Sequence, residues 1–133
     1  MPVTYIIDTT RKLIRTTCSG AVTLEDVVDH FAKLEDDPAC AGHLDVMLDV
    51  READSPPESN QLKIVNWHVA AIRAKVEFGM CAIVVNRDAM FGMMHMFSVF
   101  AERNFGAICV FRGTAEAEAW LARKQEKDET RSL

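Results

Sequence analysis

The sequence predicts a single α/β domain with a mixed, mainly parallel five-stranded sheet and four helices. Short runs of β-branched and apolar residues alternate along the chain with helix-length amphipathic segments. The first two runs, Val3–Asp8 and Leu13–Cys18, are joined by a connection short enough for an antiparallel hairpin. The length of 133 residues is that of one domain. We assign residues 1–124 to this domain and residues 125–133 to a polar C-terminal tail.

The elements after the hairpin alternate between helix and strand. In order, we expect a helix from Thr23 to about Asp36, a strand at Asp45–Val50, a helix from about Pro56 to Lys75, a strand at Met80–Val85, a helix at Asp88–Asn104, a strand at Ala107–Phe111 and a helix from Thr114. Strands that are separated by crossover helices pair in parallel, so only the first strand is expected to be antiparallel.

Two of the four helix starts carry the signal of a capping box. Thr23 precedes an apolar stripe, with the acid Asp26 in the first turn, which is a variant of the capping box. Ser55 precedes Pro56 and stands three residues before Glu58, so we expect Ser55 to cap the second long helix. His30 falls among the polar positions of the first helix, and we expect it to face solvent.

Composition and charge exclude several classes of protein. The chain is 49% hydrophobic and 26% charged, with a net charge of −5, which argues against nucleic acid or an anionic membrane as a partner. Its cysteines lack the spacing of a zinc site, and we expect them to pack as small apolar residues. No nucleotide-binding loop predicts a cofactor. No signal peptide and no span of about 20 apolar residues is evident, so we predict a cytoplasmic protein without a membrane span.

The segment Asp88–Asn104 is unusually apolar for one helix. Met90, Met94, Phe97 and Ala101 form a stripe at helical spacing, and further apolar residues widen it beyond one face. The excess surface has three explanations: core packing, a homodimer contact, or a groove between the second and third helices for a small apolar molecule. The residues of this candidate surface are Ile64, Trp67, His68, Phe91, Met93, His95, Met96 and Phe100.

No catalytic constellation is visible at fixed spacing, and we predict a protein that is not an enzyme. His68 and His95 are the best candidates for a general base because both lie in apolar helices. We favour a structural role for each of them, as a core or interface histidine.

Three arginines stand near the carboxyl ends of predicted parallel strands, where ligands gather in α/β sheets. Arg51, Arg87 and Arg112 therefore form a candidate rim for an anionic ligand or an acidic segment of a partner. The alternative is that they cap helices and pair with neighbouring acids, which is the interpretation we favour.

Several motifs resemble those of the small bacterial SpoIIAA-like proteins of the STAS type. The resemblance covers residues 3–122 and is carried by V-T-Y-I-I-D, a strand ending in S-G, the helix start T-L-E-D, the strand L-D-V-R and the terminal V-F-R-x-x-x-E-A-x-x-W-L. It implies a cytoplasmic α/β module without catalytic activity that regulates or scaffolds through protein contact. Our leading hypothesis is therefore a homodimeric regulatory module with a regulatory protein as partner. The alternative hypothesis is the binding or carriage of the small apolar molecule.

The resemblance also implies a modification site. In STAS-type antagonists of anti-sigma factors, a serine between the third strand and the second helix is phosphorylated, within a motif that reads approximately D-S-[ST or A]-G. Asp54 and Ser55 match the start of this motif, but Pro56 and Pro57 replace the small residue and the glycine. Ser55 is thus a candidate for phosphorylation as well as for helix capping.

Overall fold

The computed structural model of the protein describes the backbone of residues 2–132 and the side chains of residues 2–123. Its elements are, in chain order, β1 (Val3–Asp8), β2 (Leu13–Gly20), α1 (Leu24–Asp36), β3 (Gly42–Ala53), α2 (Ser59–Ile72), β4 (Val76–Val84), α3 (Asp88–Ala101), the short 3-10 helix η1 (Glu102–Asn104), β5 (Ala107–Phe111) and α4 (Thr114–Ser132).

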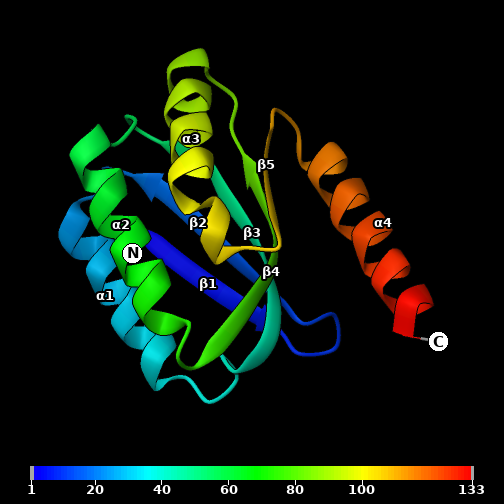
Figure 1. The fold of residues 1–133 in the computed structure, drawn as a ribbon. Helices are drawn as coiled ribbons and strands as arrows, with labels where there is room; N and C mark the ends of the chain where they lie inside the picture. The colour runs from blue at the N-terminus through cyan, green and yellow to red at the C-terminus, as the bar shows by residue number, and fades with distance from the viewer. Residues whose placement is uncertain (1, 133) are drawn as a thin grey trace.

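The strands lie in the sheet in the order β1-β2-β3-β4-β5, which is also their order in the chain. β1 pairs antiparallel with β2, and the other neighbours pair in parallel. Because crossovers are right-handed, a sheet that grows in one direction carries its crossover helices on one face. Accordingly, α1, α2 and α3 cover one face and α4 lies against the other (Figure 1). The predicted α/β fold is confirmed.

Successive residues of each strand point to opposite faces of the sheet and pack in two different cores. On β2, Leu13 faces α4 and packs in a small cluster with Met47 and Leu121. The next residue, Ile14, faces the three-helix layer and belongs to the larger cluster that includes Phe97. The sheet is thus buried on both faces, and the larger core lies beneath α1, α2 and α3.

Both ends of α1 are held by specific hydrogen bonds. The Thr23 hydroxyl accepts from the Asp26 N–H at 3.1 Å, and an Asp26 carboxylate oxygen accepts from the Thr23 N–H at 2.9 Å, which confirms the predicted cap. At the other end, the Lys75 ammonium donates to three backbone carbonyls at 2.6–2.9 Å, those of Leu34, Glu35 and Asp37. A cation at this end also complements the helix dipole.

The predicted capping role of Ser55 is wrong. α2 begins only after Pro57, and Gln61 closes its first turn through Oε1, which accepts from the Glu58 N–H at 2.9 Å. A residue that precedes proline is held away from the helical conformation, and both Ser55 and Pro56 precede one. The segment is therefore extended, and Ser55 is left exposed in the loop.

Other element boundaries also differ from the predictions. α2 ends at Ile72, and β4 begins at Val76, because the chain must leave the helix to bring Val76 opposite Gly42 of β3 and bury it. α4 continues to Ser132, so the polar residues 125–132 extend this helix. Within residues 2–132, no helix combines the length and the apolar character needed to cross a membrane.

Candidate functional site

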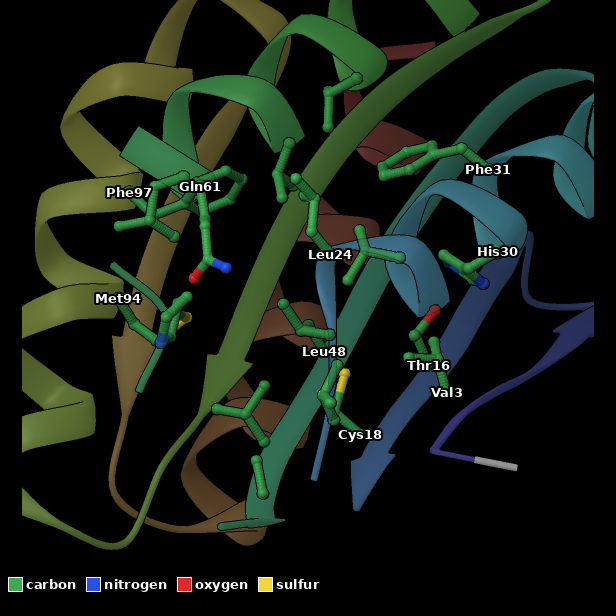
Figure 2. Close-up of a pocket in the computed structure, with 18 of the residues that line it drawn as sticks. Val3, Thr16, Cys18, Leu24, His30, Phe31, Leu48, Gln61, Met94 and Phe97 are labelled. Carbon is green, nitrogen blue, oxygen red and sulfur yellow. The ribbon is translucent and has the colours of Figure 1, made fainter. Parts of the chain in front are cut away.

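A cavity of about 390 Å³ lies between the sheet and the three-helix layer (Figure 2). β2 and β3 form its floor, the inward faces of α1 and α2 cover it, and α3 closes one side. Most of its described lining is apolar and includes Ile14, Leu24, Val27, Leu48, Val65 and Met94. This volume falls within the range of about 300–1,000 Å³ that is typical of small-molecule sites.

Short side chains on the sheet leave this space open. On β2, the residues that face the helices shorten from Ile14 to Thr16 and Cys18 toward the carboxyl end of the strand. Leu48 lies on β3, the central strand, yet it remains partly exposed. Protein interiors are otherwise packed as densely as organic crystals. The sequence therefore places an apolar space where a core would normally be filled.

The cavity opens between the start of α1 and the loop before α2. The exposed residues of its lining, Thr23, Ser55 and Glu58, all come from these two segments. They lie beyond the carboxyl ends of β2 and β3, the edge at which α/β sheets bind their ligands. A small molecule can therefore enter without passing through the packed core.

Two small polar side chains of β2 interrupt the apolar floor. Thr16 is only 5% exposed, and its hydroxyl makes no hydrogen bond to another residue of the described chain. Burial, together with the Asp49 carboxylate, raises the pKa of Cys18 to about 11, so this thiol stays protonated at neutral pH. In Figure 2 both side chains point from β2 toward the cavity.

His30 forms part of the cavity wall, and the expectation that it faces solvent is wrong. Its ring packs edge-on against Tyr5 and Phe31, with centroids 5.4 and 5.5 Å apart. Burial lowers the pKa of His30 to about 4, and the nearby Lys33 charge adds to this effect. At neutral pH the cavity therefore meets an uncharged imidazole, which can both donate and accept a hydrogen bond.

The cavity has almost no formal charge. Among the lining residues that the structure describes, Glu58 at the mouth is the only one that carries a charge at neutral pH, and no lysine or arginine takes part. Near the mouth, Gln61 contributes a neutral amide. Its oxygen accepts the Glu58 N–H, whereas its nitrogen has no partner in the described chain. Figure 2 shows this amide directed into the cavity.

The Met-rich helix α3 presents its predicted stripe to the interior. Met90, Met94, Phe97 and Ala101 are all buried, and the first three of them line the cavity. The eight residues of the candidate surface predicted on α2 and α3 do not line it: Ile64, Trp67, His68, Phe91, Met93, His95, Met96 and Phe100. The cavity thus lies beneath α1 and α2, against the sheet, whereas the groove was expected between α2 and α3.

Part of that candidate surface is exposed to solvent. Trp67 is 66% exposed and Ile64 is 40% exposed on α2, and Met96 on α3 is 39% exposed. Phe91, Met93 and Phe100 are partly buried against the main core. Val99, which widens the predicted apolar stripe but was not part of the candidate surface, is also exposed. Because large apolar side chains gather on two adjacent helices, this surface stays a predicted homodimer contact.

The two histidines considered as general bases stack on aromatic neighbours. The ring of His68 lies nearly parallel to that of Phe31, with centroids 5.5 Å apart. The exposed ring of His95 stacks on Phe91 at 6.4 Å. These contacts are those expected of structural histidines.

The three arginines of the candidate rim are engaged separately. Arg51 binds the Asp49 carboxylate at 2.8 and 3.0 Å, Arg87 donates to the backbone carbonyls of Ala53 and Asp54, and Arg112 binds the Asp88 carboxylate at 2.8 Å. The first of these pairs lowers the pKa of Asp49. Each guanidinium thus has a partner close to it, which agrees with the alternative that these arginines pair with neighbouring groups and do not form an anion site.

Sequence reasoning did not assign a site role to the polar residues deeper in the cavity: Thr16, Cys18, His30 and Gln61. One signal was available for two of them, since Thr16 and Cys18 share a strand face with the buried Ile14. No protein-family model matches this chain, and no curated protein matches it significantly.

Proposed function

We propose that this protein binds a small apolar molecule in the cavity beneath α1 and α2, as a carrier or sensor of that molecule. The observation that carries the proposal is an apolar cavity of about 390 Å³ with an open mouth in a chain of only 133 residues. An unfilled cavity forgoes the dispersion contacts that its lining could make, and an apolar ligand restores them.

The volume limits the size of the ligand. An apolar cavity of about 150 Å³ accommodates benzene. By proportion, about 390 Å³ corresponds to an occupant of roughly 15 non-hydrogen atoms. This is the size of a medium-chain aliphatic molecule or a compact bicyclic one.

Binding of the uncharged fluorescent probe N-phenylnaphthylamine tests the proposal directly. We expect saturable binding with enhanced probe fluorescence. Leu48→Trp should reduce probe affinity at least tenfold, because the indole occupies space that Leu48 leaves open in the middle of the floor. The matched control is Ile6→Trp, since Ile6 lies on β1, is 72% exposed and does not line the cavity.

Thermal unfolding of both variants shows whether the sheet stays intact. The proposal fails if the wild-type protein does not bind the probe. It also fails if folded Leu48→Trp binds the probe as well as Ile6→Trp does.

A regulatory module that acts through protein contact is a second candidate, and the position of Ser55 favours it. Ser55 is exposed, lies in an extended loop and borders the mouth of the cavity. A phosphate there would add negative charge beside Glu58 and so couple modification to ligand entry. Intact-mass analysis of protein isolated from its native cells tests this candidate: we expect a phosphate that is lost in Ser55→Ala, and an unmodified Ser55 would contradict it.

A further inference from the structure

We infer that the cavity selects an uncharged ligand with a hydroxyl or carbonyl group, and that Thr16 supplies the hydrogen bond that recognises this group. The inference rests on the proposed function and narrows it to a chemical class. Three features of the site support it: the charge of the lining, the unpartnered Thr16 hydroxyl, and the polar groups that face this hydroxyl.

The charge of the lining disfavours an anionic head group. A carboxylate that enters the cavity loses its hydration, and the described lining offers no lysine or arginine to compensate. Arg87 reaches the same edge of the sheet, but its guanidinium already donates to the carbonyls of Ala53 and Asp54. At the mouth, Glu58 repels an anion further. A fatty acid is therefore a poorer ligand than the alcohol of the same chain length.

The Thr16 hydroxyl faces the cavity and has no partner among the residues that the structure describes. The residue is 5% exposed and lines the cavity. The hydroxyl borders the open space of the cavity, so a ligand that fills this space without offering an acceptor would leave the hydroxyl unsatisfied. A ligand hydroxyl or carbonyl at this point of the floor can accept the Thr16 hydrogen.

The groups around Thr16 favour the same class of ligand. In Figure 2 the Thr16 oxygen points toward α1, the helix that carries His30. Because the pKa of His30 is lowered to about 4, its ring is neutral at physiological pH and does not attract a carboxylate. Across the cavity, the amide nitrogen of Gln61 is a second neutral donor without a partner in the described chain. Neutral donors and acceptors on an apolar background suit an alcohol, a ketone or an ester.

Displacement of bound N-phenylnaphthylamine at pH 7.5 by decanol and by decanoate tests the inference. We expect decanol to displace the probe at a concentration at least tenfold lower than decanoate. Decanol also leaves water more readily than decanoate, whichever protein binds it. The decisive comparison is therefore the affinity of one ligand for wild type and for each variant, because the hydration of the ligand is then the same on both sides.

Thr16→Val keeps the shape of the side chain and removes its hydroxyl. We expect it to weaken decanol binding about tenfold, the worth of one hydrogen bond, without weakening the binding of the apolar probe. Thr17→Val is the matched control, because Thr17 is the next residue of β2 and is exposed on the opposite face. Glu58→Gln should strengthen decanoate binding and leave decanol binding unchanged.

The outcomes separate this inference from the function on which it rests. Probe binding that is lost in Leu48→Trp, together with decanoate that binds as tightly as decanol, overturns the inference and leaves apolar ligand binding standing. Decanol binding that is equal in wild type and in folded Thr16→Val also overturns it. Absence of probe binding to the wild-type protein overturns both.

Discussion

Replacing His30 by phenylalanine keeps an aromatic ring in the cavity wall and removes its titration. The native ring packs against Tyr5 and Phe31, and burial lowers the pKa of His30 from 6.5 to about 4. Below pH 6.5 the unfolded chain therefore takes up a proton that the folded chain resists. The contribution of His30 to stability is complete above pH 6.5 and is lost as the pH falls toward 4.

The magnitude follows from the two pKa values. Each pKa unit corresponds to about 1.4 kcal/mol, and most of the loss between pH 7 and pH 5 comes from protonation of the unfolded state. For His30, with a pKa that falls from 6.5 to about 4, this loss is about 2 kcal/mol. We expect His30→Phe to lose about 2 kcal/mol less stability than the wild type over the same range.

Urea denaturation at a series of pH values measures this difference. The carboxylates whose pKa values are lowered in the fold are present in both proteins, so their contributions cancel: Asp26, Asp37, Asp49 and Glu118. An independent check is the NMR titration of the His30 ring, with an expected midpoint near pH 4. Parallel stability curves for wild type and variant between pH 7 and pH 5 would refute the claim that the fold desolvates this ring.

Other substitutions test the packing around the site. Gly79→Ala should lower the free energy of unfolding by about 2 kcal/mol in urea denaturation, because its Cβ would overlap the buried Asp45 carboxylate. Gly92→Ala is the matched control in α3, where a Cβ meets nothing within 4 Å, and it should raise the free energy of unfolding by about 0.5–1 kcal/mol. Lys75→Met should cost about 2 kcal/mol by the same measurement, since it removes the charged donor at the end of α1. Trp67→Glu should shift the protein from dimer to monomer in sedimentation and leave the far-ultraviolet circular dichroism spectrum unchanged, because Trp67 is 66% exposed and does not hold the core. A wild-type monomer would contradict the predicted homodimer contact.

Local sequence patterns were sufficient for the fold class and for much of the core. The hairpin, the alternation of strands and helices and the Thr23 cap depend on neighbours in the chain, and all are found in the structure. The stripe of Met90, Met94, Phe97 and Ala101 is buried as its helical spacing predicts. The wrong prediction of a cap at Ser55 could have been avoided from the sequence, since the two prolines that follow it disfavour a helix start at this point.

The cavity depended on distances that no local pattern contains. Its volume is the space between the sheet and the helix layer that the side chains of the two layers do not fill. The distance between the layers is set by how α1 and α2 pack over β2 and β3. His30 could not be placed from local patterns for the same reason. Its helical spacing marks it as polar, but the antiparallel strand β1 brings Tyr5 against its ring.

The sequence by itself determined the inward-facing residues of the regular apolar stripes, because these follow from the period of a helix or strand. Only the tertiary structure decided whether the inward-facing residues meet. At Leu13 and Leu121 they do, and the core is closed. Above Thr16 and Leu48 they leave about 390 Å³ unfilled, and there the protein has room for a ligand.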